Sequence, residues 1–81
     1  MIHELKTWPG VYQATLDKKK KAEFRKNDQG FEVNDILILR EWEPDKQSYT
    51  GRTLKVRVVH IVRGPDFGIP DGYVMMSIVF V

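Results

Sequence analysis

The stretch Ile36-Leu37-Ile38-Leu39 places apolar side chains on both faces of an extended segment. A strand that is apolar on both faces is covered on both sides, so this stretch predicts a central strand of a β-sheet. The strand is expected to continue to Trp42 and to stop at the turn cluster Glu43-Pro44-Asp45. The fold is therefore expected to be built around a sheet.

Four other segments have strand-like patterns, namely Met1–Lys6, Lys20–Arg25, Leu54–Val62 and Tyr73–Val81. The third of these alternates over the longest run and is expected to be the longest strand. In the second, Ala22 and Phe24 share one face and are assigned to the core. Lys21, Glu23 and Arg25 share the opposite face and are expected to project into solvent or a cleft.

One helix is predicted between the first two strands. Its apolar residues recur at the spacing of one helical face: Trp8, Val11, Tyr12, Thr15 and Leu16. Thr7 is a suitable N-cap. Pro9 falls in the first turn of the helix, where backbone N–H groups have no partner within the helix, so its missing N–H has no cost. The helix is expected to end near Asp17–Lys18, with Trp8 and Tyr12 in the core.

Five strands and one helix within 81 residues predict a mainly β protein with one packed helix, an α+β arrangement in a single domain, 1–81. So few residues cannot cover an open sheet on both faces. The expected architecture is thus a small β-barrel of about five strands, with the helix packed over one opening.

Composition narrows the range of functions. The chain has no cysteine, which excludes disulfides, thiolate metal sites and a cysteine nucleophile. His3 and His60 have no partner at metal-ligand spacing, so no metal and no cofactor are predicted. His60 is expected on the same face of its strand as Val56 and Val58, which predicts a buried imidazole. With no apolar run long enough to span a bilayer and no leader, a cytoplasmic protein without membrane contact is expected.

Charge is unevenly distributed along the chain although the formal net charge is only +2. Residues 18–26 hold six basic side chains and one acidic one, residues 27–45 hold six acidic and one basic, and residues 46–63 again favour basic ones by five. Such blocks create local fields of opposite sign. The two basic blocks are compatible with an anionic partner.

Four pieces of the chain carry a resemblance to a known family: His3–Pro9, Leu16–Asp28, Val33–Trp42 and Gly72–Ser77. They resemble the ASCH domains, the PUA-like group related to the activating-signal-cointegrator homology domain of a transcription coactivator. Within that group the chain is most similar to a short bacterial and phage subfamily of uncharacterised proteins. The resemblance covers nearly the whole chain and implies a PUA-like β-barrel, whereas fold alone does not fix activity.

The family pattern in the second piece is roughly G-x-K-T-x-E-x-R, followed later by V-G-D. Here Lys18 stands for the first glycine, Lys21 for the threonine and Asn34 for the glycine of the second motif. Asn tolerates a left-handed backbone nearly as well as Gly, whereas Lys does so at a cost.

The resemblance implies a ligand cleft formed by Lys20, Glu23 and Arg25, with Lys6 and Trp8 at its rim. Arg offers a fork of donors suited to phosphate, and Glu accepts hydrogen bonds from base amino groups. Together with the extra cation Lys21, the predicted RNA- or nucleotide-binding residues are Lys6, Lys20, Lys21, Glu23 and Arg25.

Three functions follow from these patterns and from the resemblance, with binding favoured over catalysis. The first is an RNA- or nucleotide-binding domain with a basic cleft beside the helix–strand junction. The second is a small amidohydrolase of acylated cytidine nucleosides, with Lys20 and Glu23 as catalytic residues; some ASCH relatives have such an activity. The third is a protein-interaction module whose last strand, Val74–Val81, presents an open edge. The type of RNA and the oligomeric state stay open.

Overall fold

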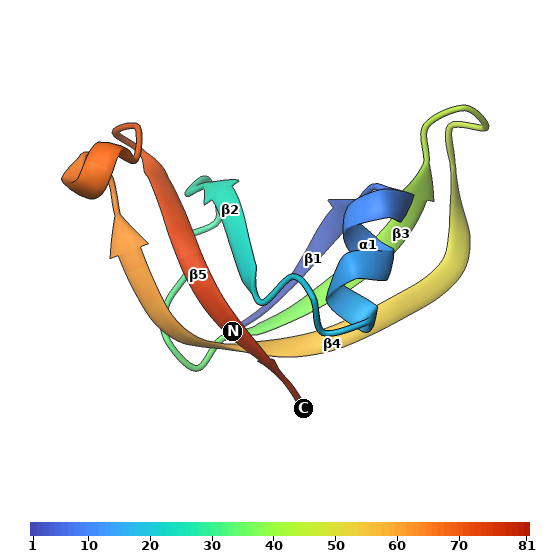
Figure 1. Ribbon diagram of the computed structural model, residues 1–81, viewed down its shortest axis with the longest axis horizontal. Helices are drawn as coiled ribbons and strands as arrows, with labels where there is room; N and C mark the ends of the chain where they lie inside the picture. Colours follow the sequence, from blue (N-terminus) through green and yellow to red (C-terminus); the bar gives the residue numbers. More distant parts are fainter.

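The computed structural model describes residues 1–81 and contains five strands, one α-helix and one 3₁₀ turn (Figure 1). In chain order these are β1 (Ile2–Thr7), α1 (Pro9–Leu16), β2 (Ala22–Lys26), β3 (Ile36–Glu43), β4 (Ser48–Arg63), η1 (Asp66–Gly68) and β5 (Tyr73–Phe80). The expected mainly β architecture with one packed helix is confirmed. None of its helices has the length and apolar content that crossing a membrane requires.

All five strands join one sheet in the order β1-β3-β4-β5-β2. β1 and β3 are parallel, and every other pair is antiparallel. The 16-residue β4 is the longest strand, as predicted. It bends into an arc and pairs with β3 on one side and with β5 on the other, so it belongs to both halves of the sheet (Figure 1). The sheet thereby curls into a half-barrel whose free edges are β1 and β2.

The last strand lies inside the sheet rather than at its edge. β5 pairs with β4 along Val74–Phe80 and with β2 along Tyr73–Ser77. The prediction that this strand presents an open edge to a partner was therefore wrong. Pairing of β5 with β2 joins residues about fifty positions apart, which a local pattern does not encode.

His60 is exposed, which contradicts the predicted buried imidazole. The register between β4 and β5 shifts between Val58 and His60, where a β-bulge adds a residue to β4. A bulge reverses the parity of every later residue, because side chains alternate between faces with period two. His60 therefore pairs with Ser77 on the outer face, while Ile61 takes the inner position opposite Met76.

The core fills the concave side of the sheet. Ten buried residues form it, namely Leu5, Tyr12, Phe31, Leu37, Leu39, Val56, Val58, Val74, Met76 and Ile78. β3 supplies two of them as a central strand, which agrees with the pattern of its sequence. α1 packs beside β3 through Tyr12 and Thr15, and the Arg52 guanidinium of β4 lies 4.9 Å from the Tyr12 ring centre.

The two faces of β2 are opposite to those predicted. Glu23 is 3% exposed, whereas Phe24, which we had assigned to the core, is 48% exposed and Ala22 is only half-buried. The pairing of Glu23 with Met76 explains this, because residues directly opposite in an antiparallel pair share a face and Met76 is in the core. An inward-pointing carboxylate is tolerated where cations pair with it.

The helix begins one residue later than predicted. Thr7 is the buried last residue of β1, and Trp8 is the N-cap, without a side-chain hydrogen bond to the helix. Pro9 therefore occupies the first helical position, where its missing N–H has no hydrogen-bond partner to lose. Trp8 is 58% exposed, so its predicted place in the core was wrong, whereas Tyr12 is buried as predicted. A helix of eight residues contacts the sheet along a narrow stripe that excludes its cap.

Candidate functional site

A cleft of about 390 Å³ opens where the two free edges of the half-barrel meet α1. Its walls come from the end of β1, the first turn of α1, the α1–β2 linker and β2; we call it the β1–β2 cleft. It is lined by Lys6, Thr7, Trp8, Val11, Lys20, Glu23, Phe24 and Arg25. Four of the five predicted binding residues, all but Lys21, therefore line one cleft.

Glu23 holds the two central cations of this cleft. The Lys20 ammonium donates to Oε1 of Glu23 at 2.9 Å, and the Arg25 Nε donates to Oε2 at 2.9 Å. Lys20 also donates to the carbonyl of Ala22. Because Glu23 is buried and each of its oxygens already accepts a hydrogen bond, its role is to position Lys20 and Arg25.

Arg25 also joins the two edges of the sheet. Its Nη2 donates to the Lys6 carbonyl of β1 at 3.0 Å, across the gap that no strand pairing closes. An arginine has five N–H donors and a lysine has three. After the bonds described above, three donors of Arg25 and one of Lys20 remain for a ligand, and the two side chains are 28% and 30% exposed. The cleft can therefore bind an anion without losing its ion pairs.

The ammonium of Lys6 is turned toward the outer face of the sheet. It lies 4.2 Å from the ring centre of Trp42, a residue that does not line the β1–β2 cleft. This cation–π contact engages the charge of Lys6. Lys6 therefore contributes to the cleft chiefly through the carbonyl that accepts from Arg25.

Exposed apolar side chains stand on both sides of the cations. Trp8 and Val11 come from the start of α1 and are 58% and 44% exposed, and Phe24 comes from β2 and is 48% exposed. Sequence patterns had placed both aromatic residues in the core. For Trp8 the missed signal is the Trp8-Pro9 pair, because proline disfavours a helical backbone at the residue before it, and Trp8 is extended with a φ of −70° and a ψ of 153°.

The end of α1 determines where Lys20 stands. The Lys19 N–H donates to the carbonyl of Ala14 at 2.9 Å and the Lys18 N–H to that of Thr15 at 3.0 Å, which is the Schellman pattern of a helix C-terminus. Lys18 has a φ of 63°, in the left-handed region that glycine favours. This is the position where the resembled family has glycine. The reversal sends the linker directly from the helix into β2.

We predict that Lys18→Gly raises the free energy of unfolding by about 0.5–1 kcal/mol. The left-handed conformation costs a residue with a Cβ roughly 1–2 kcal/mol, of which the entropy of glycine in the unfolded chain cancels part. Urea unfolding at neutral pH measures the change. Lys19→Gly is the matched control and should lower stability, because Lys19 does not have a positive φ. A Lys18→Gly protein less stable than the wild type would contradict this explanation.

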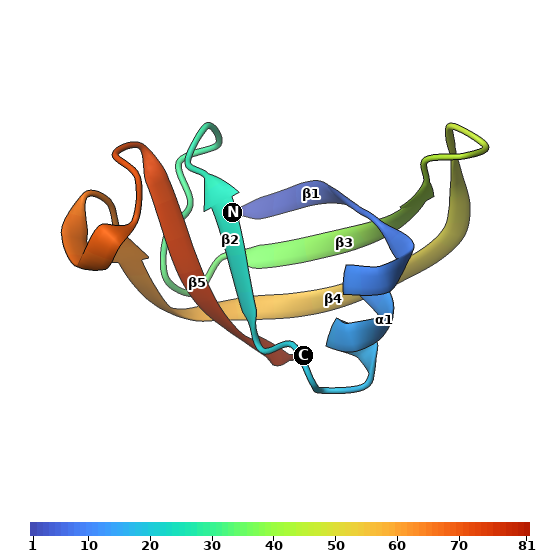
Figure 2. The same cartoon turned by 45° about the horizontal axis from the view of Figure 1, so that its top comes forward.

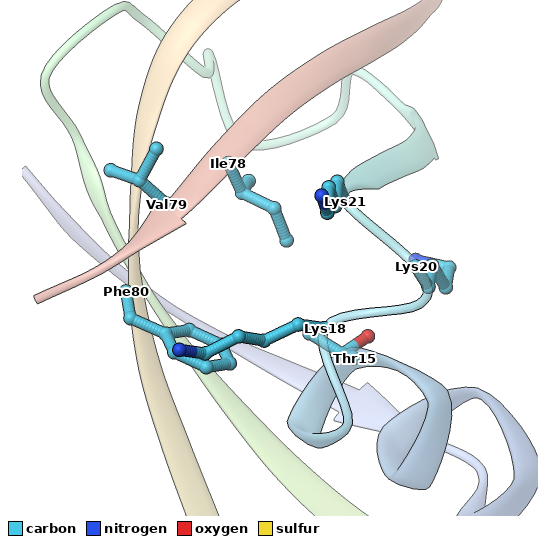
Figure 3. A pocket seen from close by; sticks show the side chains of 7 residues that line it. All are labelled: Thr15, Lys18, Lys20, Lys21, Ile78, Val79 and Phe80. Carbon is cyan, nitrogen blue, oxygen red and sulfur yellow. The ribbon is translucent and has the colours of Figure 1, made fainter.

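Lys21, the fifth predicted binding residue, lines a second pocket of about 300 Å³ on the other side of the linker (Figure 3). Ile78, Val79 and Phe80 of β5 form its apolar wall, and Lys18 extends along the Phe80 ring with its ammonium 5.4 Å from the ring centre. Thr15 and Lys20 complete the lining. We call it the linker pocket. Lys20 lines both the linker pocket and the β1–β2 cleft.

A separate buried polar cluster pins β1 to the start of β3. The Asp35 carboxylate contacts His3 Nε2 at 2.8 Å, accepts the Glu32 N–H at 3.0 Å and accepts the Met1 amino group at 2.9 Å. Burial acts to raise the pKa of Asp35, but the hydrogen bonds from Met1, His3 and Glu32 outweigh it and lower the pKa to about 2. The cluster is structural, and no group of three or more potential metal ligands is found.

Comparison with known proteins adds two findings. A family model described as a domain of unknown function (DUF3850) matches residues 2–78. A relative in Escherichia phage P2, described as an uncharacterized 12.9 kDa protein in the GpA 3′ region, is 40% identical over 66 residues. The match covers 82% of this chain and 59% of that relative, so the chain spans a little over half the length of the phage protein.

Proposed function

The chain belongs to the family described as a domain of unknown function (DUF3850), and we propose that it binds single-stranded RNA or a nucleotide in the β1–β2 cleft. We further propose that it is a PUA-like domain of ASCH type acting in the cytoplasm. The curled five-stranded sheet with one helix, and the side chains at positions 20, 23 and 25, support that relationship.

One observation supports the proposal: an exposed aromatic ring and two oriented cations line the same cleft. Trp8 is 58% exposed and offers a face on which a base can stack, an interaction worth about 1–3 kcal/mol per base, whereas the Phe24 ring is already stacked on Tyr73 with the ring centres 5.6 Å apart. Lys20 and Arg25 present donors for a phosphate, and both are fixed by Glu23. Unpaired bases and phosphates together are what single-stranded nucleic acid provides.

The assignment of Glu23 changes in this proposal. The sequence-based hypothesis is that Glu23 reads a base edge, but the carboxylate is 3% exposed and each of its oxygens faces a cation, so a base edge does not reach its remaining lone pairs. Base identity is then set by stacking and by cleft shape, which tolerate several bases. We therefore expect weak sequence preference.

Removing both cations should abolish most of the binding. We expect Lys20→Ala/Arg25→Ala to weaken the affinity for labelled single-stranded RNA by about 100-fold or more, because each of the two lost charge-assisted bonds contributes about 1.5–3 kcal/mol. Fluorescence polarisation at low salt measures the affinity. The matched control is Lys46→Ala/Lys55→Ala, which removes the same charge from residues outside the cleft.

The control separates a site from general attraction. If the control variant loses as much affinity as Lys20→Ala/Arg25→Ala, binding is non-specific electrostatics and the cleft is not the site. If wild-type protein does not bind RNA or nucleotides at low salt, the proposed function is wrong.

A second candidate function is hydrolysis of acylated cytidine nucleosides. The observation in its favour is that Thr7, Lys20 and Glu23 line one cleft, although Thr7 is buried and its hydroxyl donates to the Leu5 carbonyl at 3.3 Å. Against it, the Lys20 ammonium donates to Glu23 and to the Ala22 carbonyl, so it offers no lone pair to a substrate in this arrangement. Incubation with N4-acetylcytidine tests it: turnover that Lys20→Ala abolishes would establish this function.

A further inference from the structure

Two concave sites meet at one cation, because Lys20 lines both the β1–β2 cleft and the linker pocket. We propose that the ligand is a single strand of at least two nucleotides, with one nucleotide in each site and the phosphodiester between them against Lys20. This inference rests on the proposed function and specifies its ligand. A mononucleotide would fill only one of the two sites.

The linker pocket has the chemistry that a second nucleotide needs. Its wall on β5 is apolar, and Val79 and Phe80 are each 39% exposed, so a base can cover surface that now contacts water. Lys18 and Lys21 stand at its rim, and Lys18 already lies along the Phe80 ring (Figure 3). A base that stacks on the Phe80 ring displaces the Lys18 side chain from it, and the Lys18 ammonium can then form an ion pair with a phosphate.

The linker forms a basic ridge between the two sites. It runs from the end of α1 past the end of β5 into β2 (Figure 2). The Lys21 carbonyl accepts the Ile78 N–H at 3.1 Å, which ties the linker to β5. Of the four consecutive lysines on this ridge, Lys18 and Lys21 line the linker pocket, Lys20 lines both sites, and Lys19 lines neither. Successive phosphates of one strand match a row of cations of this kind.

The test compares adenosine 5′-monophosphate with the dinucleotide pApA by calorimetric titration at low salt. We expect pApA to bind about 10-fold or more tightly than the mononucleotide, since a second stacked base adds on the order of 1–3 kcal/mol. Lys18→Ala/Lys21→Ala should remove most of this gain. Because the structure places neither residue in the β1–β2 cleft, where the mononucleotide binds, its affinity should stay within about twofold. The control Lys19→Ala/Lys46→Ala, equal in charge, should keep the gain.

The outcomes distinguish this inference from the proposed function. If the two ligands bind wild-type protein equally well, or if the gain survives in Lys18→Ala/Lys21→Ala, the second nucleotide does not occupy the linker pocket and the inference is overturned. In both cases mononucleotide binding would still support the proposed function. If neither ligand binds and RNA does not bind, the proposed function itself fails. Retained mononucleotide affinity also shows that each variant is folded.

Discussion

Replacing Asp35 with alanine is expected to lower the free energy of unfolding by about 3 kcal/mol. The carboxylate is 6% exposed and joins His3, the Glu32 N–H and the Met1 amino group in one cluster. Its loss leaves the imidazole of His3, itself 4% exposed, without its partner at Nε2, and an unsatisfied buried polar group costs about 1–3 kcal/mol in addition to the lost bonds. Urea unfolding at pH 7 measures the change.

The control for this variant is Asp45→Ala, which removes a carboxylate from the exposed turn between β3 and β4 and should change stability by less than about 0.5 kcal/mol. An Asp35→Ala protein as stable as Asp45→Ala would show that the cluster does not hold β1 to β3. Asp35→Asn should fall between the two, because the amide keeps the shape and one acceptor but loses the charge.

Stability should also depend on pH through Asp35. Its pKa in the folded protein, about 2, lies below its ordinary value of 3.8. The folded state therefore binds this proton less readily than the unfolded state, and the stabilisation is present above about pH 4 and lost as the pH falls toward about 2. Thermal unfolding between pH 5 and about pH 2 should show a smaller loss for Asp35→Asn than for wild type.

Replacing Glu23 with alanine is expected to lower the free energy of unfolding by about 2 kcal/mol and to weaken RNA binding. Removing one partner of a buried ion pair leaves uncompensated charge and costs about 3–5 kcal/mol when both partners are buried. Lys20 and Arg25 retain 30% and 28% of their side-chain exposure, so water offsets part of that cost. Urea unfolding and fluorescence polarisation measure the two effects.

The expected decrease in RNA affinity of Glu23→Ala is opposite to the change that the net charge of the cleft alone would predict. The variant makes the cleft more positive, which by itself would strengthen attraction to RNA. We expect weaker binding because Lys20 and Arg25 lose their fixed positions, and ordering them then costs entropy. Glu4→Ala is the control, since Glu4 is an exposed carboxylate 3.6 Å from Arg40. Tighter RNA binding by Glu23→Ala than by Glu4→Ala would contradict the positioning role.

Local sequence patterns predicted where the strands lie along the chain better than they predicted which face of a strand points into the core. The apolar run Ile36–Leu39 and the alternation that begins at Leu54 each predicted a strand that the structure contains. A short apolar run is typical of a strand buried on both faces, and alternation is typical of a strand buried on one face. The faces of β2 were not predictable in this way. Ala22 and Phe24 are more apolar than Glu23, and only the pairing of Glu23 with Met76, together with its two ion pairs, explains why the carboxylate points inward.

The charged residues of the β1–β2 cleft were predictable from the sequence, whereas its exposed aromatic residues were not. The resemblance predicted that Lys20, Glu23 and Arg25 lie together, and in the structure Glu23 accepts a hydrogen bond from each of the other two. Trp8 and Phe24 follow apolar patterns that are typical of a core. They are exposed because Trp8 precedes a proline at the start of α1 and because Phe24 lies on an edge strand with the opposite face buried.

The most direct test of the central claim is to locate the contact surface of single-stranded RNA by ¹H–¹⁵N NMR titration. If the β1–β2 cleft is the site, adding oligoadenylate should shift the Trp8 indole N–H and the amides of Lys20, Phe24 and Arg25, while the amides of the β3–β4 turn stay in place. Shifts confined to the β3–β4 turn and to Trp42 and Tyr49 on the outer face, or no shifts at low salt, would contradict the claim.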